Sequence, residues 1–224
     1  MNSDLSYKPD LFPVEVLDNT EIASDVYVLS FARKHSFAAG QVVGISVTSG
    51  AGPRLYSIAS GNREDNIRLL YNIKPGGAIS PSLAEMKRGD TVYASAPFGS
   101  FHGTAKPAVL IASGTGIAPF LSMLRSGLHK DKILIHGGRT LDSFYFRDEL
   151  DALLGKENYI RCCSQESGDD VYEGRLTKYI REQESLPSGR KYYLCGLAEM
   201  VVETRDLLIE KGIPYDDIIA EIYF

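Results

Sequence analysis

The fold of the second half of this chain is decided by one stretch, AVLIASGTGIAP at residues 108–119. Its apolar first part predicts a buried strand of a parallel sheet, and Pro119 suits the first turn of the helix that follows. Between them, Gly114 and Gly116 allow a tight turn whose backbone N–H groups can approach a pyrophosphate at the helix N-terminus. Gly114, Thr115 and Gly116 are therefore candidate dinucleotide-binding residues, although the same pattern also occurs as a simple tight turn.

Downstream of this stretch, apolar runs alternate with longer amphipathic segments. That rhythm is typical of βαβ units and a parallel sheet. We expect strands at 108–112, 133–136, 159–163, 191–195 and 218–223, and helices near 119–126, 143–154, 175–183 and 198–211. The second half is therefore predicted to be an α/β parallel-sheet nucleotide-binding domain.

Upstream, the apolar segments are short, rich in β-forming residues and separated by turn residues, at 14–17, 26–32, 42–47, 55–58, 67–73 and 91–95. Strands so spaced predict a closed antiparallel barrel. One short helix is expected at 80–87, with Ser80 as its N-cap and Pro81 in its first turn. The chain should thus form two domains, a six-stranded antiparallel β-barrel at 1–104 and the α/β domain at 105–224.

Composition limits the classes of function. The 224 residues carry a net charge of -5, with 44% apolar and 24% charged residues, which is ordinary for a soluble globular protein. Neither half is basic enough for a nucleic-acid binder, and no apolar stretch approaches the roughly 20 residues of a membrane span. Cys162, Cys163 and Cys195 lack the spacing of metal ligands and cannot all pair. We expect a cytoplasmic protein without a metal, a nucleic-acid partner or a membrane anchor.

A short motif in the first half resembles a known family. Arg54-Leu55-Tyr56-Ser57 is similar to the flavin-binding Arg-x-Tyr-Ser of the ferredoxin–NADP reductase family, and the order of barrel and α/β domain agrees over essentially the whole chain. The resemblance implies that Arg54 binds the FAD pyrophosphate, Tyr56 packs on the flavin ring and Ser57 hydrogen-bonds near flavin N5. A guanidinium fork suits phosphate, and an aromatic face suits a flat heterocycle. Taken alone, the motif would also suit an ordinary edge strand.

Two further segments resemble FAD contacts of that family. Gly76-Gly77-Ala78-Ile79-Ser80 is similar to its Gly-Gly-x-x-Ser, which opens a helix whose N-terminus faces the FAD pyrophosphate. The chain ends in Glu221-Ile222-Tyr223-Phe224. By resemblance, Tyr223 covers the flavin face that the nicotinamide must reach, and Phe224 stacks on the adenine of a bent FAD. The alternative for this aromatic pair is a last strand that fills the core.

The segment at 195–200, Cys195-Gly196-Leu197-Ala198-Glu199-Met200, resembles the family's Cys-Gly-x-x-x-Met. It follows a predicted strand, and ligands of open α/β sheets bind beyond the carboxyl ends of strands. The resemblance implies that Cys195 and Gly196 lie beside the nicotinamide, where the cysteine orients the ring and forms no covalent bond. A buried cysteine is otherwise an ordinary small apolar residue. The predicted catalytic residues are accordingly Ser57, Cys195, Glu221 and Tyr223.

The choice of nicotinamide nucleotide depends on whether cations meet a 2′-phosphate. Gly137-Gly138-Arg139 and Gly174-Arg175 resemble arginine-bearing segments of NADPH-using members, and Ser164 matches a serine or threonine that such members commonly carry. Gln165-Glu166 then departs from their pattern, because an arginine commonly follows that position. NADP(H) is expected as the substrate, with NAD(H) as the alternative.

Together these residues predict an FAD-dependent reductase that transfers hydride between NADP(H) and FAD and exchanges single electrons with ferredoxin or flavodoxin. The nearest alternative is an NAD(P)H-flavin reductase or the reductase component of an oxygenase, although the four-cysteine cluster of a fused ferredoxin domain is not in this sequence. The alternative from another class is a non-turnover flavin-binding redox module of a larger complex. A monomer is expected.

This scheme requires no acid–base pair. Ser57 and Ser113 lack the context of a nucleophile elbow, which makes hydrolysis improbable. The histidines show no ligand spacing and are expected to be surface residues or hydrogen-bonded core residues: His35, His102, His129 and His136.

Overall fold

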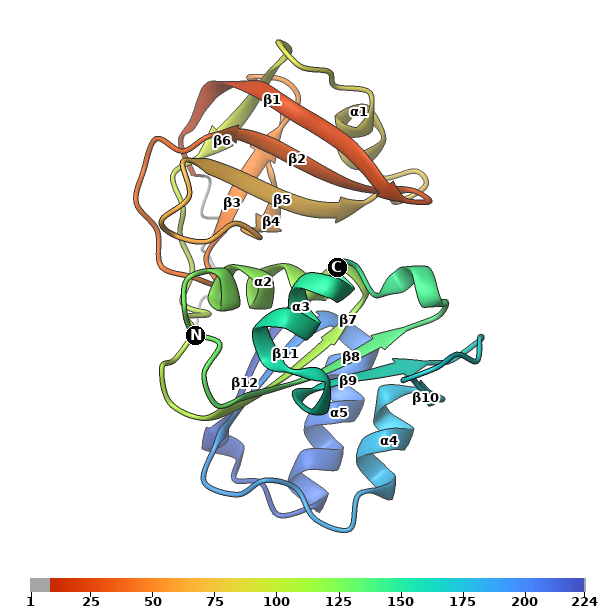
Figure 1. Cartoon of the computed structure of the whole chain (residues 1–224). Helices are drawn as coiled ribbons and strands as arrows, with labels where there is room; N and C mark the ends of the chain where they lie inside the picture. The colour runs from red at the N-terminus through yellow and green to blue at the C-terminus, as the bar shows by residue number, and fades with distance from the viewer. Residues whose placement is uncertain (1–8, 224) are drawn as a thin grey trace, which may run out of the picture.

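The computed structural model describes residues 9–223, and its first six strands form an antiparallel sheet that closes on itself. Its strands are β1 (Leu11–Ala23), β2 (Val26–Ala32), β3 (Val42–Ser46), β4 (Arg54–Ser57), β5 (Asn66–Asn72) and β6 (Thr91–Ser95), in the order β4-β3-β6-β1-β2-β5. An isolated antiparallel bridge between Ile58 and Leu69 joins the two edges. Val16, Leu29 and Ile45 are 0% exposed and fill the interior. The predicted antiparallel barrel is confirmed (Figure 1).

Two elements of the barrel differ from the prediction. β1 is 13 residues long, because its polar second part pairs with β2 in a hairpin that turns at Asp25, whose φ is 61°. Backbone hydrogen bonds of the antiparallel ladder sustain this hairpin. The helix α1 (Ser80–Ala84) is shorter than expected, and Ser80 does not cap it. The Ser80 hydroxyl instead accepts the Lys74 N–H at 2.9 Å, because Ser80 is already the first residue of the helix.

The second sheet is parallel throughout. Its strands are β7 (Ala108–Ser113), β8 (Lys132–Gly138), β9 (Tyr159–Cys163), β10 (Tyr172–Glu173), β11 (Lys191–Leu197) and β12 (Ile218–Tyr223), in the order β10-β9-β8-β7-β11-β12. Figure 1 shows α2 (Ala118–Arg125) and α3 (Arg147–Leu154) on the barrel side of the sheet, with α4 (Leu176–Glu182) and α5 (Ala198–Glu210) on the other. The predicted α/β parallel-sheet domain is confirmed.

Short 3-10 turns fill several connections that the sequence left undefined. They are η1 (Gly114–Ile117), η2 (Leu141–Ser143), η3 (Lys156–Asn158) and η4 (Tyr215–Asp217). The predicted helix at 143–154 begins only at Arg147, because Phe146 adopts a left-handed φ of 59° that no helix interior tolerates. The strand β10 was not predicted, since two residues give no readable periodicity.

The two halves are joined by an arginine clamp and an aromatic contact. Arg125, at the end of α2, donates from Nη1 to the Ala59 carbonyl of the barrel at 2.7 Å and from Nε and Nη2 to the two Glu149 oxygens, each at 2.7 Å. Phe101 packs edge-on against Tyr193, with ring centroids 5.6 Å apart. The barrel and the parallel sheet are therefore held in one arrangement, which matters for any site between them.

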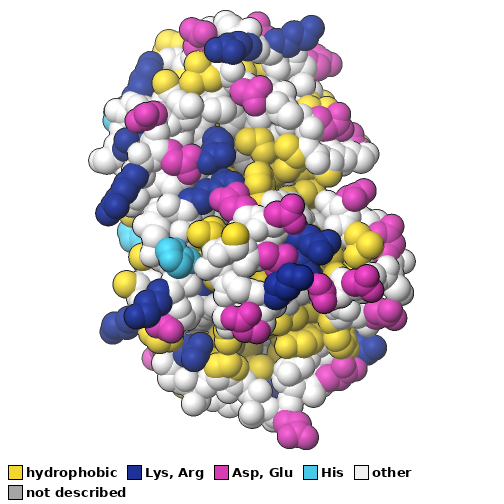
Figure 2. Space-filling view, in the orientation of Figure 1, with side chains coloured by type: hydrophobic (Ala, Val, Ile, Leu, Met, Phe, Trp, Pro, Cys, Tyr) yellow, Lys and Arg dark blue, Asp and Glu magenta, His cyan; other side chains and the backbone are white. Residues whose placement is uncertain are grey.

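No helix within residues 9–223 is long and apolar enough to cross a membrane. The three cysteines all lie in that range, are buried and form no disulfide. On the face drawn in Figure 2, basic and acidic side chains are interspersed over both halves, so this face offers no continuous basic surface for a nucleic acid.

Candidate functional site

Three of the predicted catalytic residues meet where the barrel faces the parallel sheet. Ser57, at the end of β4, is 2% exposed and donates from Oγ to Glu221 Oε2 at 3.1 Å, across 164 positions of sequence. Cys195 is 0% exposed and lies beside Glu221 in register, on the neighbouring strand. Strand ends from both halves therefore build one polar centre. The fourth residue, Tyr223, pairs through its backbone with Leu197, but its side chain and Phe224 lie outside the described residues.

The Glu221 carboxyl has an unusual environment. Burial raises its pKa above the ordinary range, and the hydrogen bond from Ser57 offsets part of that rise. A carboxyl group of this kind can hold a proton closer to neutral pH than an exposed glutamate does. In this pair Ser57 keeps its proton and donates the hydrogen bond, and Glu221 is the group that can gain or lose a proton beside a ligand.

Glycines bring the turn after β7 against the end of β11. A Cβ on Gly116 would lie 2.4 Å from the Cys195 carbonyl oxygen, and a Cβ on Gly196 would lie 2.2 Å from Ser113 Oγ. Only glycine allows such backbone approach. Ser113 Oγ is buried and has no hydrogen-bond partner among residues 9–223. The turn that was predicted to bind a dinucleotide therefore lies directly beside Cys195, with a polar atom left for a ligand.

His136 contacts the Gly114 carbonyl of this turn and was not among the predicted site residues. It is 0% exposed, and its Nε2 lies 3.3 Å from the Gly114 carbonyl oxygen while its Nδ1 lies 3.1 Å from the Tyr159 hydroxyl. Burial lowers the pKa of His136 to about 4, so the ring is neutral at physiological pH. The expectation of a hydrogen-bonded core histidine is confirmed, and the only sequence signal for its position was the Gly-Gly pair that follows it.

The flavin motif lies on β4 with its side chains partly open. Arg54 is exposed and Leu55 is 57% exposed, while Tyr56 is half-buried and packs edge-on against Tyr71 with centroids 5.9 Å apart. Burial raises the pKa of Tyr56 to about 12, which keeps the phenol neutral. This short strand presents an exposed apolar side chain, an aromatic ring and an exposed arginine. Such a set suits a ligand that combines a flat ring system with phosphates. The residues present therefore fit FAD, although the individual contacts stay predictions.

The loop at 76–80 is tied to the same side of the barrel. Gly76 has a φ of +70° and open space around it, and Gly77 lies so close to the Lys74 carbonyl that a Cβ would come within 2.8 Å. Ala78 is exposed, whereas Ile79 is buried. Tyr71 donates to Asn19 Oδ1 at 3.0 Å, and Asn19 donates to the Leu83 carbonyl of α1 at 2.9 Å. These bonds connect the Tyr56 region to the helix that was predicted to face the FAD pyrophosphate.

A pocket lies beyond the carboxyl end of β9, beside β10, and we call it the outer pocket. It is lined by residues that follow β9 and that surround β10: Cys163, Ser164, Gln165, Glu166, Ser167, Glu173 and Gly174. Glu166 is held in place, because its Oε2 accepts the Leu141 N–H at 2.7 Å. Arg139 and Arg175 are exposed and adjoin the outer pocket without lining it: the Arg139 carbonyl accepts the Gln165 N–H at 2.9 Å, and Arg175 directly follows Gly174. Of the three predicted nucleotide-binding residues in this region, the structure brings only Ser164 into the pocket.

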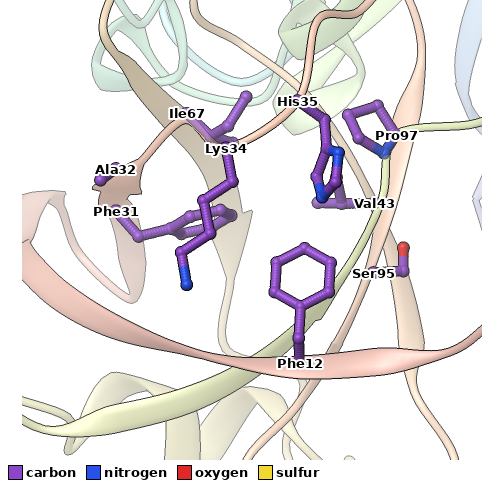
Figure 3. A pocket seen from close by; sticks show the side chains of 9 residues that line it. All are labelled: Phe12, Phe31, Ala32, Lys34, His35, Val43, Ile67, Ser95 and Pro97. Carbon is purple, nitrogen blue, oxygen red and sulfur yellow. The ribbon is translucent and has the colours of Figure 1, made fainter.

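A further small hollow lies in the barrel wall (Figure 3). The Phe12 and His35 rings line it with centroids 5.2 Å apart and planes tilted by 56°, and Lys34 Nζ lies 5.5 Å from the Phe12 ring centroid. None of the predicted site residues lines this hollow. It belongs to the packing of the barrel rather than to the site between the two halves.

Comparison with known proteins defines the class of protein. Residues 13–102 match the model of the oxidoreductase FAD-binding domain, and residues 110–206 match that of the oxidoreductase NAD-binding domain. The fold and the site therefore define an oxidoreductase that uses FAD and a nicotinamide nucleotide, and that transfers electrons between them. More particularly, the two matches together span most of the chain in the order that its motifs predicted, so the chain belongs to the oxidoreductases built from an FAD-binding and an NAD-binding domain.

Individual relatives agree with this assignment. The chain is 29% identical over 230 residues to the reductase component 2 of terephthalate 1,2-dioxygenase from Comamonas, covering 95% of this chain and 68% of that protein. It is 29% identical over 217 residues to the toluate 1,2-dioxygenase electron transfer component of Pseudomonas putida, covering 92% and 64%. This chain thus spans about two thirds of the length of those relatives. A ferredoxin NADP+ reductase from Neisseria gonorrhoeae, solved with FAD and NADP, shares the fold with a TM-score of 0.85 at 22% identity, covering 96% and 99%.

Proposed function

We propose that this chain takes hydride from a nicotinamide nucleotide onto FAD and passes the electrons singly to an iron–sulfur centre or a flavodoxin. The observation that carries the proposal is the convergence of Ser57, Cys195 and Glu221 between the FAD-binding barrel and the nucleotide-binding sheet, with Ser57 Oγ 3.1 Å from Glu221 Oε2. FAD, when bound, supplies hydride acceptance and one-electron release. The protein supplies the position of the two rings.

Each residue of this centre has a proposed task. Ser57 offers its hydroxyl near the reacting edge of the flavin, and Glu221 holds or releases a proton at that hydroxyl. Cys195 is small and buried, so it leaves room for a flat nicotinamide ring at the end of β11. The turn of Gly114, Thr115 and Gly116 binds the pyrophosphate next to it, because Gly116 lies against the Cys195 carbonyl.

We further infer that NADH is the better reductant. With the nicotinamide beside β11 and the pyrophosphate at the end of β7, the adenosine extends over the ends of β8 and β9 to the outer pocket. Two carboxylates line that pocket, and the backbone of Leu141 fixes Glu166 there. A carboxylate accepts hydrogen bonds from ribose hydroxyls and repels a 2′-phosphate. Arg139 and Arg175, which favour NADPH in the sequence, adjoin the pocket but are not among the side chains that line it.

Anaerobic stopped-flow mixing of the FAD-loaded chain with NADH or NADPH tests both statements. We expect bleaching of the flavin by both nucleotides, with the ratio of reduction rate to Kd about tenfold higher for NADH. An equal or higher ratio for NADPH would restore the arginine-based expectation. Flavin that neither nucleotide reduces would end the hydride-transfer proposal and favour a non-turnover flavin module.

A second candidate is the reductase component of an oxygenase, because one relative named above is the reductase component of a dioxygenase and the other is the electron transfer component of one. Both candidates need FAD that stays bound, whereas a flavin reductase releases its flavin. The reduced chain is therefore mixed with a [2Fe–2S] ferredoxin, a Rieske-type oxygenase component, flavodoxin or free FMN. Rapid one-electron transfer to one of the protein acceptors supports the corresponding role. Loss of yellow colour on desalting, together with turnover of free FMN alone, would replace both candidates with a flavin reductase.

A further inference from the structure

The buried ring of His136 determines the direction of one peptide group in the phosphate-binding turn. The Gly114 carbonyl oxygen can only accept a hydrogen bond, so the neutral ring must carry its proton on Nε2, 3.3 Å away. Nδ1 is then an acceptor, and the Tyr159 hydroxyl donates to it across 3.1 Å. One hydroxyl thus fixes the tautomer of the histidine, and the histidine fixes the Gly114 carbonyl.

Further buried groups hold this arrangement in place. The Arg161 guanidinium lies 5.1 Å over the Tyr159 ring and is 2% exposed. Its Nη1 donates to Asp151 Oδ2 at 3.0 Å, and its Nη2 donates to the Asp170 carbonyl at 3.3 Å. Asp170 lies in the loop that carries the outer pocket. Contacts therefore connect Asp151 through Arg161, Tyr159 and His136 to Gly114, and Arg161 also connects to the loop of the outer pocket. The positive charge of Arg161 disfavours the protonated form of His136.

The carbonyl and N–H of one trans peptide point in opposite directions. When His136 holds the Gly114 carbonyl inward, the Thr115 N–H of the same peptide points outward, to the face where a dinucleotide would lie. Gly114 can sustain this geometry because its φ is +52° and its surroundings are open. The first N–H groups of a helical segment also lack intrahelical partners, and η1 begins at Gly114.

We propose that His136 is a positioning residue for the nicotinamide nucleotide, which holds the Gly114–Thr115 peptide so that the Thr115 N–H meets the pyrophosphate. The proposal rests on the proposed function, since it requires a dinucleotide at this turn. Within η1 the Gly114 carbonyl also accepts from the N–H three residues further on, as the 3-10 turn requires. Without the His136 donor it would keep that bond alone, the peptide would be held less firmly, and the Thr115 N–H would meet the pyrophosphate less often.

The test compares His136→Leu, which removes the donor, with His136→Gln, whose amide nitrogen can occupy the place of Nε2. The FAD-loaded variants are reduced in a stopped-flow instrument with whichever nucleotide reduces the parent chain better. For His136→Leu we expect Kd to rise about tenfold or more, with the limiting reduction rate within about threefold of the parent. For His136→Gln we expect Kd within about threefold. Ile135→Val, on the same strand and 5% exposed, is the packing control and should leave Kd unchanged.

A hydride donor without phosphate separates positioning from general damage. Reduction by N-benzyl-1,4-dihydronicotinamide should be the same for His136→Leu and the parent chain, because this donor makes no pyrophosphate contact. An unchanged nucleotide Kd in His136→Leu, or an equal loss with both donors, would overturn the proposal. If His136→Leu does not fold, Tyr159→Phe, which frees the tautomer, must raise Kd about threefold or the proposal fails. A parent chain that neither nucleotide reduces would instead refute the proposed function.

Discussion

The inner site, made of Ser57, Cys195, Glu221 and the turn at 114–116, differs from the outer pocket in how it is built. The inner site is buried and held by backbone contacts, such as that of Gly116 against the Cys195 carbonyl. The outer pocket is lined largely by exposed side chains that follow β9. Backbone geometry tolerates little change, whereas exposed side chains can be exchanged. The proposed function therefore assigns hydride transfer to the closely packed inner site and the choice of nucleotide to the more easily altered outer pocket.

The largest effect should come from Gly116→Ala. The added Cβ would lie 2.4 Å from the Cys195 carbonyl oxygen, and both partners are backbone-anchored, so the turn and the end of β11 must separate. We expect a loss of about 4 kcal/mol in nucleotide binding or folding, measured by titration of the flavin spectrum and by thermal unfolding. Gly50→Ala, with nothing within 4 Å, is the control and should change neither. Tight nucleotide binding by Gly116→Ala would refute the rigidity of the inner site.

Acid should weaken the region beneath the inner site next most strongly. His136 has a pKa of about 4 against 6.5 in the unfolded chain, so the unfolded state takes up the proton first. Stability is then complete above about pH 6.5 and falls by about 3 kcal/mol as the pH approaches 4. Arg125 also lowers the pKa of Glu149, which adds a loss below the usual glutamate range. Urea unfolding between pH 4 and 8 measures how the free energy of unfolding depends on pH. His136→Gln should weaken this dependence between about pH 4 and 6.5. If the variant and the parent chain show the same dependence, His136 is excluded as its source.

Removing either partner of the polar pair should have a smaller effect. Ser57→Ala and Glu221→Gln each lose or weaken the 3.1 Å hydrogen bond while leaving the glycine contacts intact. We expect the limiting rate of flavin reduction to fall by a factor of about 10 to 50, that is about 1.5 to 2.5 kcal/mol. Because the two residues act as one unit, the double variant should lose little more than either single variant. Fully additive losses in stopped-flow reduction would show that the two residues act separately.

The smallest effect is expected in the outer pocket. Glu166→Gln keeps the acceptor for the Leu141 N–H but removes a charge from the pocket in which the proposed function places the ribose. The preference for NADH over NADPH should shrink by a factor of about 5, or about 1 kcal/mol, and the change should be smaller at high salt. Glu184→Gln, on an exposed segment away from the pocket, is the matched control. A preference that Glu166→Gln leaves untouched would remove this carboxylate from the discrimination.

The sequence by itself determined the two architectures. Alternating short strands in the first half, and apolar runs with amphipathic helices in the second, are local periodicities that report which side of an element is buried. The turn at 114–116 and the place of Cys195 at the end of a strand could also be expected, because ligands bind at the carboxyl ends of parallel strands. Local exceptions were missed, such as the left-handed Phe146 that delays α3 and the hydroxyl of Ser80 that bonds to Lys74.

Only the tertiary structure decided how the site is assembled. The contact of Ser57 with Glu221 joins strands 164 positions apart, and no local pattern encodes such a distance. The same holds for the Gly116 contact with Cys195 and for the bond from His136 to Gly114, because each depends on which strands become neighbours in the sheet. Burial lowers the pKa of His136 and raises the pKa of Glu221, and in each case it favours the neutral form of the side chain. These shifts arise only once the chain has folded, because only folding buries the two side chains.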